Sequence, residues 1–211
     1  MCQIQIKSRI CGGMILLEHV GVCEKGGFTV ADSNITKKAL AFALKELMEE
    51  LPFEKINIAS ICERCGMNRK SFYYHFKDKY DLVNWIFDTE FIALMMNRPE
   101  VKWDSFERIC EYFYKNRNFY CKVLRITGQN SFSEHLREFA RPLFRDRIEF
   151  ILKGQEIPQI CLDFLTDGFV CSIERWLLDK DCMPPEEFVS AMKMVVQGAA
   201  TDVYQDMKEE K

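Results

Sequence analysis

Residues 61–82 read ICERCGMNRKSFYYHFKDKYDL, and this stretch predicts two short helices joined by a tight turn. Gly66 favours a helix end, because the residue after a helix often takes a left-handed backbone that glycine adopts without a Cβ clash. Asn57 and Asn68 are good N-caps for a helix on each side of Gly66, ending near Cys65 and His75. Two short helices with a glycine-containing turn are typical of a helix-turn-helix.

Working outward, apolar residues recur at helical spacing on both sides of this motif. Residues 39–51 form an amphipathic helical pattern that Pro52 ends. A further helix is predicted from Asp78 onward, and its apolar residues are Leu82, Val83, Ile86, Phe87 and Phe91. Others are predicted over 104–115, 117–125, 131–153, 158–178 and 185–208. The pattern Ser131-x-x-Glu134 is a capping box for one of them. With no convincing strand alternation and no internal repeat, the sequence predicts an all-α fold with about nine helices.

The opening stretch resembles the signature of the tetracycline-repressor (TetR/AcrR) family. The matching features are Ile61, Gly66, the run Phe72-Tyr73-x-His75-Phe76, Lys79 and Leu82. Cys62 and Cys65 stand where the family usually has alanine, and Lys70 where glycine is frequent. The resemblance covers roughly residues 34–82 and implies a sequence-specific DNA-binding transcriptional regulator. The sequence contains neither a glycine-rich phosphate loop nor a serine nucleophile elbow, the motifs that would indicate an enzyme instead.

Three parts are expected along the chain: an irregular arm over 1–33, a helix-turn-helix DNA-binding domain over 34–82, and a helical effector and dimerisation domain over 83–211. The middle part holds nine Lys and Arg against seven Asp and Glu, whereas the whole chain has a net charge of −3. A mildly basic module on an acidic body fits docking on DNA at one end. Ordinary surface variation explains so small an excess equally well.

Two readings of the first part remain open. Residues 24–27, EKGG, can be encoded by a purine-rich run that resembles a ribosome-binding site, and Val30 by a GTG start codon. We therefore expect either that translation begins at Val30 or that residues 1–33 form a disordered arm that could touch DNA. A signal peptide is weakly supported, because Glu18 and His19 interrupt the apolar stretch.

A recognition helix in the major groove presents its N-terminal residues to base edges. Arg69 can bind guanine O6 and N7 through two hydrogen bonds. Lys79 is expected in the first turn of the next helix, where its ammonium and the helix N-terminus can hold one phosphate together. Phe72 and Phe76 are expected in the core. The predicted DNA-binding residues are Asn57, Asn68, Arg69, Lys70, Ser71, Tyr73, Tyr74, His75 and Lys79.

Cys62-x-x-Cys65 has the spacing of a zinc or redox motif. No second such pair and no histidine cluster accompany it, so structural packing is the favoured interpretation and a thiol or metal sensor the alternative. No metal site and no cofactor are predicted. The ten cysteines are scattered through helical patterns, which favours a reducing cytoplasm, and no apolar run is long enough for a membrane helix.

The resemblance implies a small-molecule pocket and a helical dimer interface in the second half. Each pocket candidate could instead be plain core: Trp103, Phe106, Phe113, Tyr120, Phe144 and Phe164. The candidate dimer residues are Phe164, Gly168, Cys171, Phe188, Met192, Val195, Ala199 and Val203, with an intramolecular core as the competing explanation. A two-fold dimer would place two recognition helices about 34 Å apart, or a multiple of that distance, on a near-palindromic double-stranded operator.

Residues 113–120, FYKNRNFY, followed by 128–132, GQNSF, look like a subgroup related to regulators of dihydroxyacetone-kinase operons. This resemblance implies that a protein co-regulator can replace a small-molecule effector. The expected function is a cytoplasmic homodimeric repressor. The alternatives are an activator or a regulator controlled by a protein partner, with the same DNA contacts, and a helical interaction protein without DNA readout.

Overall fold

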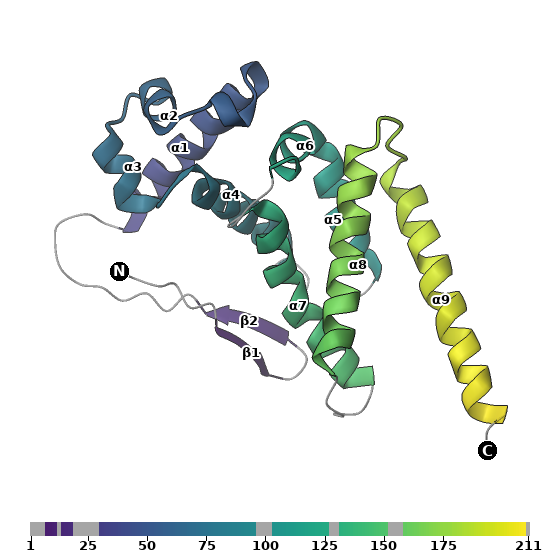
Figure 1. Cartoon of the computed structure of the whole chain (residues 1–211). Helices are drawn as coiled ribbons and strands as arrows, with labels where there is room; N and C mark the ends of the chain where they lie inside the picture. Colours follow the sequence, from purple (N-terminus) through teal and green to yellow (C-terminus); the bar gives the residue numbers. More distant parts are fainter. Residues whose placement is uncertain are drawn as a thin grey trace. The chain divides into compact units, whose positions relative to one another are not determined.

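The computed structural model describes residues 7–11, 14–18, 30–95, 103–126, 131–151 and 158–209. By its contacts the chain divides into two compact units, Met1–Ser105 and Phe106–Lys211, and each is described by itself (Figure 1). Within the described residues the fold is all-α apart from one hairpin, with nine α-helices and one 3-10 helix, as the sequence predicted. The predicted boundary at 82/83 falls inside α4 (Lys79–Met95). The functional limits of the domains stay predictions.

The hairpin lies in the segment that was expected to be an irregular arm. Strand β1 (Lys7–Cys11) pairs antiparallel with β2 (Met14–Glu18), with Lys7 opposite Glu18 and Cys11 opposite Met14. The sequence analysis did not predict these strands. A Gly-Gly pair stands between them in the sequence, and it is a typical two-residue hairpin connection that could have indicated them.

The first unit also contains four helices around a small core. Helix α1 (Val30–Glu50) starts before the predicted periodic segment and ends just before Pro52. A short 3-10 helix η1 (Phe53–Lys55), which the sequence analysis missed, leads to α2 (Ile58–Arg64) and α3 (Arg69–His75). Helix α1 contacts α2, α3 and α4, and α2 contacts α3. Figure 1 shows α2 and α3 as two short helices beside α1.

Apolar burial fixes how these helices pack. The predicted inward face of α4 is buried throughout: Leu82, Val83, Ile86, Phe87 and Phe91. On α1 the buried residues of the predicted face are Leu40, Ala43, Leu44, Leu47 and Met48, whereas Leu51, just after the helix, is exposed. Ion pairs also join α1 to its neighbours: Lys45 pairs with Glu90 of α4, and Arg64 of α2 pairs with Glu50 and Glu46.

The second unit is built from longer helices, whose bounds agree with the predicted ranges within a few residues. They are α5 (Trp103–Lys115), α6 (Arg117–Leu124), α7 (Phe132–Ile151), α8 (Gln159–Leu178) and α9 (Pro185–Glu209). Half of the predicted capping box is confirmed, because the Glu134 backbone N–H donates to Ser131 Oγ at 3.3 Å. No helix in the described ranges has both the length and the apolar character that a membrane span needs.

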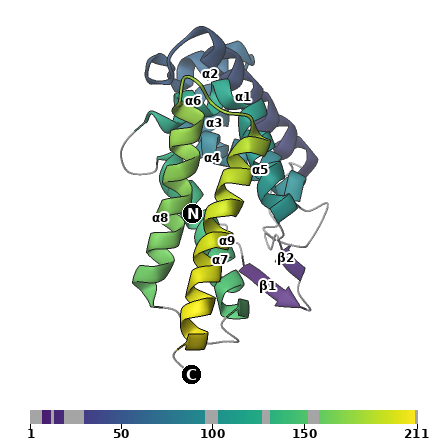
Figure 2. The ribbon, with the colours of Figure 1, turned by 90° about the vertical axis from the view of Figure 1, so that its right-hand side faces the viewer.

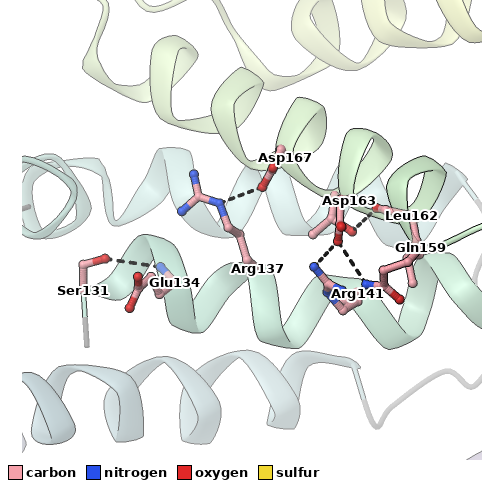
Figure 3. Close-up of polar contacts among 9 residues, drawn as sticks. Ser131, Glu134, Arg137, Arg141, Gln159, Leu162, Asp163 and Asp167 are labelled. Atoms are coloured by element: carbon pink, nitrogen blue, oxygen red, sulfur yellow. Dashed lines mark hydrogen bonds and ion pairs between the residues drawn. The ribbon is translucent and has the colours of Figure 1, made fainter. Parts of the chain in front are cut away.

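Helices α7 and α8 lie side by side and are joined by charged side chains (Figure 3). Arg137 Nε donates to Asp167 Oδ1 at 2.9 Å, and one turn further along Arg141 pairs with Asp163. Gln159 Nε2 also donates to Asp163, at 3.1 Å. These contacts fix the register between the two helices at positions 137–167 and 141–163.

An aromatic stack joins α9 to the end of α8. The rings of Trp176 and Phe188 are stacked with centroids 4.5 Å apart, and Trp176 Nε1 donates to the Met183 carbonyl at 2.8 Å. Arg117 Nε donates to the Leu177 carbonyl at the last turn of α8, at 2.8 Å. Beyond this point α9 diverges from α8 in the view of Figure 1, and Figure 2 shows the same two helices after a 90° turn. The α9 residues Met194 and Val195 are 70% and 60% exposed.

Candidate nucleic-acid interface

Asparagine side chains begin both helices of the motif, as predicted. Asn57 Oδ1 accepts the Ser60 backbone N–H at 2.9 Å, and Ser60 Oγ accepts the Asn57 N–H at 3.2 Å, which completes a capping box at α2. Asn68 Oδ1 accepts the Ser71 backbone N–H at 2.8 Å at the start of α3. Ser71 Oγ also donates to this oxygen, at 3.2 Å. Asn57, Asn68 and Ser71 are therefore engaged in local structure.

The turn between the two helices depends on glycine. Gly66 has a φ of +67°, in the left-handed region where a Cβ would clash with the backbone. Its N–H donates to the Glu63 carbonyl at 3.1 Å, and the following Met67 N–H donates to Cys62 at 2.8 Å. This pair of hydrogen bonds reverses the chain, so that α3 can start three residues after Gly66.

Helix α3 separates core side chains from solvent-facing ones. Phe72 and Phe76 are 0% and 3% exposed, which confirms their predicted core role. Arg69 and Lys70 are exposed in the first turn, and Tyr73 and Tyr74 are 51% and 78% exposed further along. Arg69 donates to the Tyr73 hydroxyl at 3.5 Å. The outward face of α3 thus carries two cations and two phenols.

His75, at the end of α3, is half-buried beside an α1 cation that the sequence analysis did not select. Burial, and secondarily the charge of Lys37, lower the pKa of His75 from its ordinary value of 6.5. Lys37 Nζ also lies 5.9 Å from the centroid of the Trp85 ring. Only the packing of α1 brings Lys37 to this place. The adjacent pair Lys37-Lys38 was the sequence signal for an extra cation near the motif.

Lys79 begins α4, but its ammonium faces backbone carbonyls of the same unit. Its Nζ donates to the carbonyls of Phe53 at 2.7 Å and Ile56 at 2.8 Å. It also lies 4.3 Å from the centroid of the Phe53 ring. Burial lowers the pKa of Lys79. The N-terminus of α4, which was predicted to hold a phosphate together with this ammonium, is capped by Asp78, which accepts the Tyr80 and Asp81 N–H groups at 2.9 Å.

The two motif cysteines pack within α2. Cys62 is 2% exposed, and Cys65 Sγ donates to the Ile61 carbonyl at 3.3 Å. Burial raises the pKa of both thiols, which disfavours the reactive thiolate. Over the described ranges, no three His, Cys, Asp or Glu side chains come together as a metal site would require.

The residues predicted to line a pocket differ in their burial and in the side chains that they contact. Phe113 and Tyr120 are fully buried against each other, with ring centroids 4.8 Å apart, and the Tyr120 and Tyr112 hydroxyls are 2.6 Å apart. Phe106 and Phe144 both pack against Phe169. Phe164 is 76% exposed. The side chain of Trp103 lies outside the described residues.

The predicted dimer residues fall into two groups. Phe164, Gly168 and Val195 are exposed on α8 and α9, and a Cβ added at Gly168 would meet no atom within 4 Å. Cys171 and Met192 are half-buried. Phe188 is 8% exposed and packs on Trp176, so within this chain it is a core residue. The side chains of Ala199 and Val203 lie outside the described residues.

Two family models match this chain, one in its N-terminal half and one mainly in its C-terminal half. The model of bacterial regulatory proteins of the tetR family matches residues 43–86, and that of the transcriptional regulator C-terminal region matches residues 102–198. Together they cover about two thirds of the sequence. The chain belongs to the TetR family of DNA-binding transcriptional regulators, and its class is therefore regulator and not enzyme.

A curated relative supports this family assignment. The chain is 29% identical over 96 residues to the HTH-type dhaKLM operon transcriptional activator DhaS of Lactococcus lactis subsp. lactis (strain IL1403), over 44% of this chain. The matched region spans about half (51%) of that relative's length. The resemblance to the dihydroxyacetone-kinase-operon subgroup is thereby confirmed.

Solved structures show the same fold at low sequence identity. A dihydroxyacetone kinase operon activator DhaS matches with a TM-score of 0.57 and 19% identity, over 79% of this chain and 96% of its own. A TetR transcriptional regulator from Streptococcus agalactiae 2603V matches with a TM-score of 0.60 and 20% identity, over the same shares of the two chains.

Proposed function

We propose that this regulator binds a near-palindromic DNA operator as a homodimer and represses transcription there. The observation that carries the proposal is the two-sided character of α3. Phe72 and Phe76 anchor one side in the core, while Arg69, Lys70 and Tyr74 are exposed on the other. A short helix with a rigid inner face and a cationic, aromatic outer face suits readout of the major groove.

Different side chains of α3 would contribute in different ways. Arg69 would bind a guanine edge, after giving up its long hydrogen bond to Tyr73. Lys70 would neutralise a phosphate, and Tyr73, Tyr74 and His75 would contact the backbone or base edges near the groove. Lys37, beside His75, would add a further cation for phosphate at the C-terminal end of α3. Asn57, Asn68 and Ser71 would support these contacts by holding the helix starts.

The exposed apolar residues of α8 and α9 support the homodimer. Phe164 on α8 and Val195 on α9 are 76% and 60% exposed, and Ile160 is 74% exposed on α8. Burying such side chains against a second copy would remove apolar area from water. The glycine at 168 leaves room for close approach of a partner helix.

Activation is the second candidate, and one finding favours it: the Lactococcus relative is named a transcriptional activator. Both candidates use the same DNA contacts and differ in where the operator lies relative to the promoter. A reporter fused to the chain's own upstream region separates them. Repression predicts higher expression in a strain that lacks the protein, and activation predicts lower expression.

Control by a protein co-regulator is proposed in preference to a small-molecule effector. Phe113 and Tyr120, two of the predicted pocket residues, already fill their space by packing on each other. DNA titration of the purified protein tests this proposal. A small-molecule effector would change DNA binding by the purified protein alone, whereas control by a co-regulator would require that a second protein be added. As a regulator that acts on chromosomal DNA, the chain would work in the cytoplasm.

The DNA-binding proposal is tested by titrating the purified protein onto its own upstream DNA and onto unrelated DNA at several salt concentrations. Selective binding that weakens as salt rises is expected. Arg69→Ala should cost about 1–3 kcal/mol and relax specificity at one base pair. Lys115→Ala, at an exposed position of α5, is the control. Equal affinity for both DNAs at every salt concentration would contradict the proposal.

The dimer proposal is tested by Phe164→Glu in sedimentation or light scattering. A charge at this exposed apolar position of α8 should shift the protein toward monomer, with its helical content unchanged. Phe42→Glu is the matched control, because Phe42 is also a largely exposed aromatic residue (64%) but lies on α1. A dimer that persists in Phe164→Glu would place the interface elsewhere.

A further inference from the structure

We infer that Lys79 acts on DNA recognition as a positioning residue: its ammonium ties the two ends of the helix-turn-helix together and does not neutralise a phosphate. The inference rests on the proposed DNA-binding function and differs from what the family resemblance implied for this residue. Its basis is the pair of hydrogen bonds from Lys79 Nζ to the Phe53 and Ile56 carbonyls.

The hydrogen bonds from Lys79 link the two ends of the helix-turn-helix because of where the two carbonyls lie in the chain. Ile56 immediately precedes Asn57, the N-cap of α2, and Lys79 is the first residue of α4. The two bonded residues are 23 positions apart, and the segment between them contains α2, the Gly66 turn and α3. One ammonium therefore links the residue before the motif to the residue after it.

The anchoring side of this link is rigid. Phe53 and Ile56 are each 1% exposed, and the Ile56 N–H donates to the Phe53 carbonyl at 3.1 Å. The Phe53 ring packs edge-on against Tyr80, the residue after Lys79, with centroids 5.4 Å apart. The ammonium is thus held by two carbonyls and a ring that belong to the core of the unit, and charge-assisted hydrogen bonds of this kind are strong.

The groups that were predicted to hold a phosphate, the Lys79 ammonium and the N-terminus of α4, already have hydrogen-bond partners within the protein. Two of the three Lys79 N–H donors go to the carbonyls. The free N–H groups at the start of α4 go to the Asp78 carboxylate, whose negative charge would repel a phosphate. A phosphate bound by these same N–H groups would have to compete with both sets of hydrogen bonds.

The salt dependence of binding separates the two roles. Each neutralised phosphate contributes about 0.9 to the slope of log K against log salt. We expect Lys79→Met to leave this slope unchanged on operator and on unrelated DNA, because the bound complex loses no ion pair. Lys70→Met is the matched control on the exposed face of α3, and its slope should fall by about 0.9.

Positioning is distinguished from stability alone by the ratio of operator affinity to unrelated-DNA affinity, measured well below the melting temperature of each variant. We expect this ratio to fall roughly tenfold in Lys79→Met, the effect of losing one charge-assisted hydrogen bond. An unchanged ratio would overturn the positioning role. A slope that falls by about 0.9 would overturn the inference whatever the ratio.

A measurement on the unaltered protein covers the case in which Lys79→Met does not fold. Acetylation of lysines at limiting reagent, read by mass spectrometry, should label Lys79 more slowly than the exposed Lys70 in the absence of DNA. Operator DNA should then protect Lys70 and leave Lys79 unchanged. Labelling of Lys79 at the rate of Lys70, or protection of Lys79 by DNA, would overturn the inference.

These tests also separate this inference from the proposed function. If the wild-type protein shows no selective, salt-dependent DNA binding, the proposed function fails. The labelling rate of Lys79 in the free protein still shows whether its ammonium is held by the carbonyls.

Discussion

The guanidinium of Arg64 holds the carboxylate of Glu50 through two parallel hydrogen bonds, with Nη1 and Nη2 at 2.9 and 2.8 Å from the two oxygens. This pair joins the end of α1 to the end of α2, and Glu46 lies 4.0 Å from the same guanidinium. A bidentate pair restricts both side chains to one geometry. It therefore fixes how the first helix of the motif is oriented on α1.

Glu50→Gln should lower the melting temperature slightly at neutral pH, because the pair is exposed and screened by water. The hydrogen bond to Arg64 lowers the pKa of Glu50 below 4.5. The contribution is therefore present above that value and is lost as pH falls through the folded-state pKa. Melting curves of wild type and Glu50→Gln should converge in acid. Glu49→Gln, at the adjacent exposed position, is the control, and an equal loss in that variant would contradict a specific pair.

Replacement of the α2 cap should be costly only when the acceptor is removed. Asn57→Ala is expected to lower the free energy of unfolding by about 1 kcal/mol, because the Ser60 N–H loses its partner. Asn57→Asp keeps an acceptor oxygen and should stay close to wild type. Chemical denaturation measures both variants. If the two substitutions destabilised the protein equally, the capping role would be wrong.

Gly66→Ala should destabilise the protein by about 1–2 kcal/mol, the cost of an alanine in the left-handed region. No atom lies within 4 Å of a Cβ at this position, so backbone strain alone accounts for the cost. Gly168→Ala is the contrasting variant. It lies within α8, where alanine should stabilise the isolated protomer by up to about 1 kcal/mol. Unfolding of diluted protein by denaturant checks both signs.

Acid should destabilise the first unit partly through His75. Burial and the Lys37 charge lower the pKa of His75 below its ordinary value of 6.5, so the unfolded chain takes up a proton more readily than the folded one. Stability then rises with pH between the two pKa values and is lost as pH falls below 6.5. His75→Asn should lose less stability than wild type between neutral pH and about pH 5. Identical pH profiles would show that His75 is not involved.

The thiol-sensor alternative predicts reactive cysteines in α2, and the structure predicts the opposite. Burial raises the pKa of Cys62 and Cys65, so few thiolates form at neutral pH. Iodoacetamide should alkylate the exposed Cys161 of α8 first, and the buried Cys110, whose pKa burial raises to about 12, last. Peptide mass spectrometry gives the order. Early modification of Cys62 or Cys65 would revive the sensor hypothesis.

The sequence predicted features that depend on neighbours along the chain. The caps at Asn57 and Asn68 and the left-handed Gly66 are local, so the helix-turn-helix was found with its bounds almost correct. The inward faces of α1 and α4 followed from the helical period alone. The family resemblance identified the class.

Features that depend on tertiary packing could not be predicted in the same way. Lys79 meets Ile56 only because α4 packs back on the end of η1, whereas its place in the first turn of a helix led to the prediction of a phosphate contact. Lys37 reaches the surroundings of His75 through the packing of α1. Phe188 was assigned to a dimer stripe because the stripe's period does not show which of its residues stack on Trp176. The hairpin had a local Gly-Gly signal that was not used.

The shortness of α3 limits how much sequence one protomer can distinguish. Its seven residues extend about 10 Å at ~1.5 Å per residue, the length of about three base pairs. With four distinguishable base pairs at each position, a three-base-pair word recurs by chance about every 64 base pairs. A bacterial genome contains millions of competing positions, so a single copy of this helix would be occupied almost anywhere. The proposed homodimer would read two such words together, and the fixed spacing between them would then add to the sequence that the regulator distinguishes.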